Sequence, residues 1–420
     1  MHSFNAELQQ RLTAIREQGL LRELRRVDSA QGPRIKIGGQ ELINFSSNDY
    51  LGLANHHVLK EAAVRVVEKF GAGAGASRLI CGSLAPFHEL EETLASFKGT
   101  DAALTFSTGY AAALGTITAL LGKDDIIIVD KLVHACIVDA AKLSGAKLRV
   151  FAHNDLNDLE DILKWADTKS RSQKPDATIL IVTESVFSMD GDHAPLPEIV
   201  ALKEKHGAWL MVDEAHATGL YGVNRRGLAE ASGVSDRIEI QMGTLGKALG
   251  ASGGYICGSR KLVDFLVNRA RSFIFSTAPV PAAAAAALAA IRLVQSSEGE
   301  NLRAALWQNV NTLASGIRRL SNPSPPDQKN HNLIQEYAAA ILPLIIGDEA
   351  RTVQYANRLR ERGIFIPAIR YPTVARGSSR LRITLTAAHA TTEIPELLTV
   401  LETLAVQFSI LSSGVWSLNA

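Results

Sequence analysis

The sequence predicts an α/β protein with a mainly parallel sheet in a large domain, a smaller α+β domain at the C-terminal end and a helical arm at the N-terminus. At 420 residues, the chain exceeds the roughly 250 to 300 residues at which one hydrophobic core usually stops growing, so two domains are expected. Short runs rich in Ile, Val and Leu alternate with segments of helical length, which is typical of a parallel sheet covered on both faces. These runs are Ala103–Phe106, Ile126–Val129, Leu148–Phe151, Thr178–Thr183, Trp209–Val212 and Ile238–Met242.

The elements outside this sheet are predicted from spacing and composition. Apolar residues at helical spacing predict an amphipathic helical arm from about Ala6 to about Arg26. The alanine-rich run Pro281–Val294 is shorter than the roughly 20 residues that span a bilayer and indicates a buried helix. Three prolines among polar residues mark Ser321–Asn332 as a linker. After it we expect a strand at Ala340–Ile346, a helix at Thr352–Arg362 and short strands through Leu385. The arm is placed at residues 1–50, the large domain at 51–290 and the small domain at 291–420.

The charge balance argues against a nucleic-acid or membrane partner. Lys and Arg number 44 and Asp and Glu number 43, so no global field attracts a polyanion. Three cysteines, Cys81, Cys136 and Cys257, are too few and too scattered for a disulfide framework or a metal site. The N-terminal segment lacks the apolar core of a signal peptide. We therefore expect a cytoplasmic protein that acts on small molecules and holds no metal.

Three segments carry residues suited to catalysis. The apolar run Trp209–Val212 is followed by Asp213 and His216, although Asp213 could simply cap a turn and His216 could be a core histidine. Lys247 lies among glycines after the next run, where a solvent-facing lysine is the alternative, and its spacing is not that of a P-loop. The segment Phe106–Ala113 passes from strand to helix. Its N–H groups can bind a phosphate at the positive end of the helix, or it can be an ordinary turn.

Together these segments supply the groups that a pyridoxal 5′-phosphate (PLP) site requires. Lys247 offers an amine for a Schiff base, and the turn at Gly109 offers an anion-binding nest. Asp213 offers a carboxylate that keeps the pyridine nitrogen protonated, which lets the ring accept electrons from a substrate carbanion. His216 is placed to hydrogen-bond the phenolic oxygen of the ring. His134, which begins a helix after a strand, could stack on the ring face or be an incidental histidine at a helix start.

The order of these motifs resembles the α-oxoamine synthases, a family of fold-type I PLP enzymes. The resemblance extends from about Leu42 to about His389 and implies the fold-type I architecture for the large domain. The matching segments are Asn44–Leu53, Gly71–Gly82, Phe187–Asp192, Val212–His216, Thr244–Lys247 and Ser379–Arg382.

The resemblance also implies roles for individual residues. The catalytic residues would be Lys247, His134, Asp213 and His216. Further cofactor contacts would come from Gly109, Tyr110, Ser188 and Thr244, and from Ser276 and Thr277 donated by a partner subunit. Arg382 would bind the carboxylate of the amino acid with a two-pronged guanidinium, for which lysine is a poor substitute. Arg22 would lie near the carboxylate of the acyl chain, and Thr373 is placed with the substrate residues.

Family members are typically homodimers with shared active sites, and they condense an amino acid with an acyl thioester with loss of CO₂. We expect L-alanine and a pimeloyl thioester of CoA or acyl carrier protein, a step of biotin synthesis, with Lys247 as the proton-transfer base. Siblings that use glycine or serine share every cofactor residue named above. They are 2-amino-3-ketobutyrate CoA ligase, 5-aminolevulinate synthase and serine palmitoyltransferase. A non-catalytic scaffold subunit is the remaining alternative, and such a subunit is expected to lack the lysine that this chain has at position 247.

Overall fold

The computed structural model describes residues 3–170, 174, 177–321 and 339–407. The chain divides into two compact units. The larger unit comprises Leu51–Ser188 and Asp192–Arg303, and the smaller comprises Met1–Tyr50, Met189–Gly191 and Ala304–Ala420. The predicted linker beyond Ser321 and the tail Ile410–Ala420 lie outside the described residues.

The larger unit is built on a seven-stranded sheet in the order β3-β9-β8-β7-β6-β4-β5. Strands β4 to β8 pair in parallel, whereas β9 is antiparallel to both β8 and β3, so the predicted mainly parallel sheet is confirmed. The strands are β3 (Ala102–Phe106), β4 (Ile126–Asp130), β5 (Lys147–Phe151), β6 (Ile179–Glu184), β7 (Trp209–Asp213), β8 (Ile240–Thr244) and β9 (Gly254–Gly258).

Each apolar run predicted as a strand forms one, and β9 is the strand that the apolar runs did not reveal. Its sequence, Gly-Tyr-Ile-Cys-Gly, has glycine at both ends, which weakens the β signal. The glycine is needed, because a Cβ on Gly254 would lie 2.5 Å from the carbonyl oxygen of Thr108. The strand therefore passes directly beneath the turn that precedes α4 (Gly109–Leu120).

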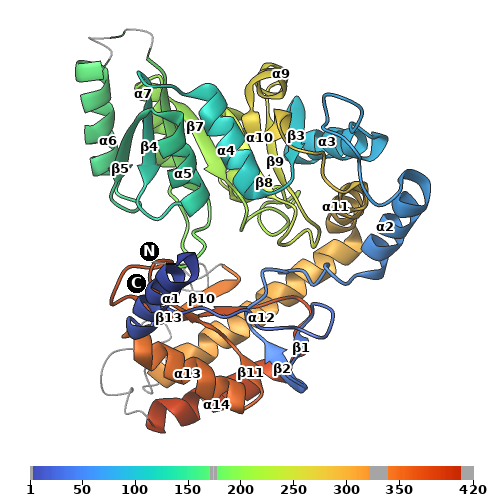
Figure 1. Ribbon diagram of the computed structural model, residues 1–420, viewed down its shortest axis with the longest axis vertical. Helices are drawn as coiled ribbons and strands as arrows, with labels where there is room; N and C mark the ends of the chain where they lie inside the picture. Colours follow the sequence, from blue (N-terminus) through green and yellow to red (C-terminus); the bar gives the residue numbers. More distant parts are fainter. Residues whose placement is uncertain (1–2, 171–173, 175–176, 322–338, 408–420) are drawn as a thin grey trace. The chain divides into compact units, whose positions relative to one another are not determined.

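Helices cover both faces of this sheet (Figure 1). On one face the sheet packs with α4, α5 (Ala135–Ser144), α9 (Arg260–Arg269) and α10 (Arg271–Ile274) around a core of fully buried aliphatic side chains. On the other side α3 (Ala85–Lys98) contacts β3 and β9, and α7 (Leu196–Lys205) contacts β7. The remaining helical segments are α2 (His57–Phe70), α6 (Leu156–Trp165), the π-helical turn Ala166–Ser170, α8 (Leu228–Ala231), the 3₁₀ turn Ser235–Arg237 and α11 (Pro281–Val294).

The alanine-rich run forms α11 with the bounds that the sequence predicts, and most of its side chains are buried. Helix α12 (Ser297–Ser321) follows it, and the boundary between the two units falls within α12 after Arg303. Among the described residues, no helix combines the length and the apolar character that a bilayer span requires.

The smaller unit contains two three-stranded sheets, β1-β2-β11 and β10-β13-β12. In the second sheet β10 and β12 are both antiparallel to the central strand β13, and α13 packs on it. The predicted strand and helix after the linker are confirmed as β10 and α13. The elements are β1 (Arg34–Ile37), β2 (Gln40–Asn44), β10 (Ile341–Gly347), α13 (Glu349–Glu361), β11 (Ile364–Phe365), β12 (Ala368–Ile369), β13 (Ser379–Thr384) and α14 (Glu393–Gln407).

The N-terminal helix is shorter than the predicted Ala6–Arg26. Helix α1 spans Phe4–Glu17, and Gly19 follows at φ +68°, a left-handed conformation that favours glycine and ends helices. The prediction was therefore wrong for the segment after Gln18. The apolar side chains Leu8 and Leu12 are exposed in this chain.

Candidate active site

Lys247 lies in the loop that follows β8, and its Nζ is 2.7 Å from Nε2 of His216. The loop is held by a hydrogen bond from the amide of Gly250 to the carbonyl of Lys247. Gly250 has φ +60°, and a Cβ there would lie 2.5 Å from the backbone of Leu53 and Ala54. The glycine after Lys247 therefore allows a turn that a larger residue could not enter, and the turn directs the amine toward His216.

Asp213 is the last residue of β7 and lies beside Glu184, the last residue of β6, in the parallel register of the two strands. Both side chains are buried, with 6% of Asp213 and 2% of Glu184 exposed. One Asp213 oxygen accepts a hydrogen bond from the amide of Ala215 at 2.9 Å. Burial raises the pKa of Asp213, and the positive charge of Lys247 opposes this rise. The carboxyl ends of two parallel strands thus bring two carboxyl groups and an amine together.

The sequence predicts Glu184, like Asp213, at the carboxyl ends of parallel strands, where ligands bind, but it gives Glu184 no role in the PLP site. Burial and the neighbouring Asp213 raise the pKa of Glu184 to about 8, and its carboxyl group accepts hydrogen bonds from the backbone N–H groups of His134 and Ser188. It therefore links the loop after β4 to the loop after β6. The signal that places Glu184 there is the same as for Asp213, because both are acidic residues that end a buried apolar strand.

We expect Glu184→Gln to change how stability depends on pH in the protein without cofactor. Between about 4.5, the ordinary pKa of glutamate, and about 8, the folded state of the natural chain holds a proton that the unfolded state has lost. The free energy of unfolding of the natural chain should therefore fall as the pH rises through this window, and the glutamine variant should lack this contribution. Denaturation midpoints measured from pH 5 to pH 9 test this, and an identical pH dependence for both proteins would contradict it.

His134 caps the N-terminus of α5, where its Nδ1 accepts a hydrogen bond from the amide of Cys136 at 3.2 Å. The residue keeps part of its surface exposed. Partial burial lowers the pKa of His134, against the attraction of the Asp213 carboxylate. A neutral imidazole that accepts at Nδ1 keeps its other nitrogen as a donor. Ser188 is half-buried in the loop after β6.

The turn before α4 has the form expected for a phosphate site. Thr108 caps the helix through its hydroxyl, which accepts from the amide of Ala111 at 3.0 Å. Gly109 and Tyr110 begin the helix, and the first N–H groups of a helix have no acceptor within it. The hydroxyl of Tyr110 donates to Asp139 at 2.8 Å, so the side chain is occupied and its backbone N–H is the group that could bind an anion. Thr244 ends β8, and its hydroxyl donates to the carbonyl of Gly253 at 3.0 Å.

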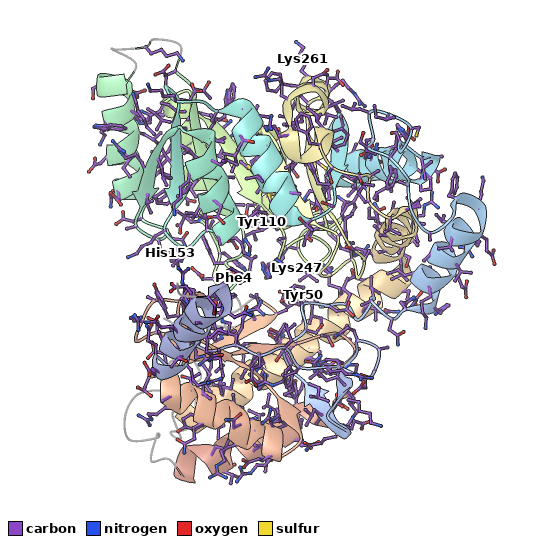
Figure 2. The ribbon with its side chains drawn as sticks, viewed as in Figure 1. Phe4, Tyr50, Tyr110, His153, Lys247 and Lys261 are labelled. Carbon is purple, nitrogen blue, oxygen red and sulfur yellow. The ribbon has the colours of Figure 1, made fainter. Side chains whose placement is uncertain are left out.

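These residues fit PLP by the chemistry of their groups. The amine of Lys247, the buried carboxyl group of Asp213 and the start of α4 are the three groups that bind the aldehyde, the ring nitrogen and the phosphate of this cofactor. Glu184 has a buried oxygen, Oε1, without a hydrogen-bond partner among the described residues. Figure 2 shows Tyr110 and Lys247 at the same edge of the larger unit.

Ser276 and Thr277 lie in a segment that contacts the Gly71–Gly82 loop. Thr277 forms an antiparallel bridge with Ser77, and the Ser276 hydroxyl donates to the carbonyl of Thr277. In the described residues, none of their recorded contacts is with Lys247 or His216. Their predicted role as donors to the site of a partner subunit stays a prediction.

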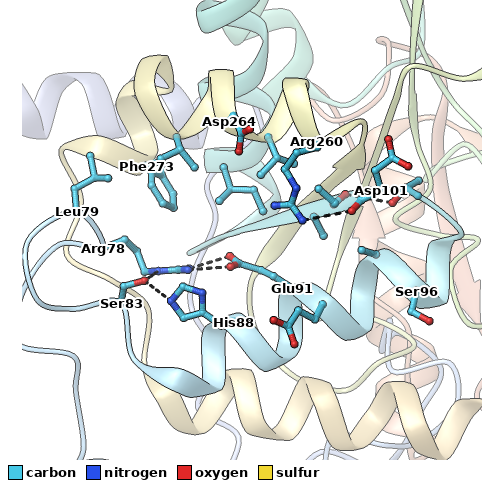
Figure 3. A pocket seen from close by; sticks show the side chains of 18 residues that line it. Arg78, Leu79, Ser83, His88, Glu91, Ser96, Asp101, Arg260, Asp264 and Phe273 are labelled. Carbon is cyan, nitrogen blue, oxygen red and sulfur yellow. Dashed lines mark hydrogen bonds and ion pairs between the residues drawn. The ribbon is translucent and has the colours of Figure 1, made fainter.

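The Gly71–Gly82 loop is anchored through Arg78, which Figure 3 shows paired with Glu91. The two terminal nitrogens of the guanidinium each lie 2.9 Å from a carboxylate oxygen of Glu91, and the guanidinium lies over the rings of Phe87 and Phe273. A cavity of about 550 Å³ opens beside this pair. It is not lined by any of the residues that we call the Lys247 group, which are Lys247, His216, Asp213 and Glu184. Arg78 therefore fixes the conformation of the Gly71–Gly82 loop.

The predicted substrate residues lie in the smaller unit. Arg382 on β13 is buried, and its two terminal nitrogens each lie 3.1 Å from the side-chain oxygen of Asn48. Asn48 belongs to the Asn44–Leu53 motif but was not assigned a role from the sequence. Arg22 donates to the hydroxyl of Thr373 at 3.3 Å, so the structure brings these two predicted residues together.

The fold and the Lys247 group define a class of protein, and the comparisons with known families agree with it. The family model of aminotransferase class I and II matches residues 40–401. The chain therefore belongs to this family of fold-type I PLP enzymes.

The family resemblance predicted from the motifs is confirmed by named relatives. The 8-amino-7-oxononanoate synthase of Geotalea daltonii is 46% identical over 394 residues, which cover 94% of this chain and 95% of that protein. A serine palmitoyltransferase of S. paucimobilis, solved with bound PLP and myriocin, superposes with a TM-score of 0.87 at 28% identity, covering 97% of this chain and 100% of that chain. The 8-amino-7-oxononanoate synthase of Francisella tularensis superposes with a TM-score of 0.70 at 28% identity, covering 88% of this chain and 99% of that chain.

Proposed function

We propose that this chain catalyses the PLP-dependent condensation of L-alanine with a pimeloyl thioester, releasing CO₂ and the free thiol and forming 8-amino-7-oxononanoate for biotin synthesis. The observation that carries the proposal is the near full-length similarity to 8-amino-7-oxononanoate synthases, at 41 to 49% identity. The Lys247 group supports it, because that group contains the amine, carboxyl and imidazole functions that this chemistry uses. The acyl donor is a thioester of CoA or of acyl carrier protein.

The cofactor, when bound, supplies an electron-accepting ring that stabilises negative charge at the α-carbon of the amino acid. In our proposal Asp213 holds the proton on the ring nitrogen, and His216 donates to the phenolic oxygen. Lys247 moves the α-proton, since its Nζ lies at the end of a flexible stem next to His216. His134 and Ser188 orient the ring from the two loops that Glu184 links.

In our proposal the amino acid is held by its carboxylate at Arg382. We expect Arg382→Lys to raise the KM for the amino acid about 10- to 100-fold with a much smaller change in kcat, since hydrogen bonds to charged groups contribute about 1.5 to 3 kcal/mol. Steady-state kinetics test this. Arg358→Lys, on an exposed ion pair of α13, is the control and should leave both constants unchanged. An unchanged KM in the Arg382 variant would remove this residue from substrate binding.

The competing activity is that of a sibling enzyme such as serine palmitoyltransferase. One observation favours this activity. The serine palmitoyltransferase superposes with a TM-score of 0.87, whereas the Francisella tularensis 8-amino-7-oxononanoate synthase superposes with a TM-score of 0.70. Sequence identity favours the enzyme that uses alanine. The Geotalea daltonii 8-amino-7-oxononanoate synthase is 46% identical over nearly the whole chain, whereas the serine palmitoyltransferase is 28% identical. Mass spectrometry of the products formed from mixed alanine, glycine and serine with pimeloyl-CoA and palmitoyl-CoA decides between them. The proposal predicts the alanine and pimeloyl product, and turnover with serine or glycine but not alanine would reject it.

We also propose a homodimer whose interface includes the Gly71–Gly82 loop and the segment Phe275–Val280. The support is a set of apolar side chains on two loops that the Ser77–Thr277 bridge joins. Leu79, Ile80, Phe275 and Val280 are 50%, 80%, 72% and 50% exposed. Exposed apolar clusters of this kind are typical of protein interfaces.

Ile80→Glu should therefore shift the protein toward monomers and weaken PLP binding, because a charge would be buried in the interface and the partner's contribution from Ser276 and Thr277 would be lost. Sedimentation velocity and PLP titration measure the two effects. Val150→Glu, on the edge strand β5, is the control, since Val150 is also half-exposed but lies on a different part of the larger unit. A dimer that tolerates glutamate at position 80 would contradict this interface.

We place the enzyme in the cytoplasm. The support is that all three cysteines are free and that Cys81 is exposed, which suits a reducing compartment.

A further inference from the structure

A histidine outside the proposed cofactor contacts joins two loops that carry them. His153 lies in the turn after β5, with Nδ1 2.9 Å from an oxygen of Asp130 and Nε2 2.6 Å from an oxygen of Asp192. Because each ring nitrogen faces a carboxylate, both nitrogens act as donors, and this requires the positively charged imidazolium. Figure 2 shows His153 at the same edge of the larger unit as Tyr110 and Lys247.

The first carboxylate belongs to the loop that carries His134. Asp130 is the last residue of β4 and is fully buried. The oxygen that faces His153 also accepts the amide of Leu132 at 2.7 Å, and the other oxygen accepts the amide of Asn154 at 2.9 Å. Asp130 therefore sets the path of the chain from β4 toward His134.

The second carboxylate belongs to the loop that carries Ser188. The carbonyl of Asp192 accepts the amide of Phe187 at 3.0 Å, which closes the loop around Ser188. The side chain of Asp192 also accepts from the amide group of Asn154 at 3.1 Å. The ring of Phe187 lies edge-on against the His153 ring, with centroids 4.4 Å apart at 90°. This arrangement fixes the ring plane of His153 between the two acids.

We propose that His153 is a positioning residue whose positive charge holds the His134 loop and the Ser188 loop in the arrangement that binds the cofactor. The inference rests on the cofactor roles proposed above for His134 and Ser188. It complements the contact from Glu184, which links the backbones of the same two residues.

The charge on His153 is stable over the physiological range. Although burial opposes the charge, the hydrogen bonds to Asp130 and Asp192 raise the pKa of His153 to about 10. These two carboxylates are the charged groups that face the ring, one from β4 and one from the loop after β6. The stabilisation is complete below about 6.5, the ordinary pKa of histidine, and is lost as the pH rises through about 10.

The test compares His153→Gln with His206→Gln. His206 is buried, whereas His153 is partly buried, and His206 is paired with one carboxylate, Asp167, at 2.5 Å. It precedes β7, at the opposite end of the strand from Asp213. Protein stripped of cofactor is titrated with PLP, and the absorption spectrum of the bound cofactor is recorded. We expect His153→Gln to weaken PLP affinity about tenfold or more and to shift the spectrum. His206→Gln should lower the unfolding midpoint without changing either property.

Asp192→Asn provides the second variant, because it removes one charge with little change in shape. We expect it to weaken PLP affinity in the same direction, and the double variant with His153→Gln to lose less than the product of the two single effects. The excess stability of the natural chain over His153→Gln should shrink as the pH rises from about 6.5 to about 10 and should be gone above that range. Unchanged PLP affinity and spectrum in both variants, with a natural chain that binds PLP, would overturn the role of His153. Failure of the natural chain itself to bind PLP would instead overturn the proposed function.

Discussion

Lys247→Ala is expected to lose about 10³-fold or more in kcat while keeping its fold, because general acid–base catalysis by a positioned group alone contributes about 10² to 10⁴-fold. Lys247 is also the amine that would bind the cofactor, so the variant loses both the proton-transfer base and the covalent attachment of the cofactor. Its Nζ lies 2.7 Å from Nε2 of His216, and its positive charge opposes the rise in the pKa of Asp213. The substitution therefore removes the residue that interacts with both His216 and Asp213. Single-turnover assays and circular dichroism measure activity and fold separately.

Lys261→Ala is the matched control for this experiment. Lys261 is an exposed lysine on α9, and Figure 2 shows it at the edge of the larger unit opposite to Lys247. Its removal should leave kcat and KM unchanged. Substantial remaining turnover in the Lys247 variant would contradict the role given to this amine.

The largest expected effect on stability comes from a buried ion pair behind the site. Lys98 on α3 has no exposed side chain, and its Nζ lies 2.5 Å from a carboxylate oxygen of Glu214, which directly follows Asp213. Lys98 also donates to the carbonyl of Arg226, and Glu214 accepts the amide of Ala229 at 2.9 Å. Lys98→Met should destabilise the protein by about 3 to 5 kcal/mol, since it leaves the Glu214 charge buried without its partner.

Denaturant titration measures this loss, and two further variants interpret it. Lys164→Met removes an exposed lysine from ion pairs with Glu160 and Asp161, which is expected to cost about 0 to 1 kcal/mol. The double variant Lys98→Met with Glu214→Gln should recover part of the stability, because no unpaired charge then remains. A Lys98 variant as stable as the Lys164 variant would show that the pair does not support the Asp213 turn.

Much of the fold could be predicted because buried parallel strands are continuous apolar runs. This pattern located β4, β6 and β7. Asp213, the acidic residue that ends β7, indicated which edge of the sheet carries the site. The strand β9 escaped because glycines replace the apolar residues where it passes under the Gly109 turn. The end of α1 depended on one glycine at position 19, whose left-handed conformation is not visible in the helical spacing.

The chemistry of the site could be predicted from residues that stand in local motifs, such as Lys247 and Asp213. Its supporting contacts could not, because they join residues that are far apart in the sequence. His153 lies 39 residues from Asp192, and Lys98 lies 116 residues from Glu214. Only the folded sheet brings these partners together, so the sequence does not show which charged residues form pairs. Arg382 was found from its motif, whereas its partner Asn48 required the structure.

The most direct test of the account is to locate the bond between the protein and its cofactor. Purified protein is incubated with PLP, treated with borohydride, digested and analysed by mass spectrometry. We predict that the mass of the reduced cofactor appears on the peptide that contains Lys247, and that Lys247→Ala removes this label while Lys261→Ala does not. A label on another lysine, or no label on any peptide, would contradict the central claim that Lys247 holds PLP beside Asp213 and His216.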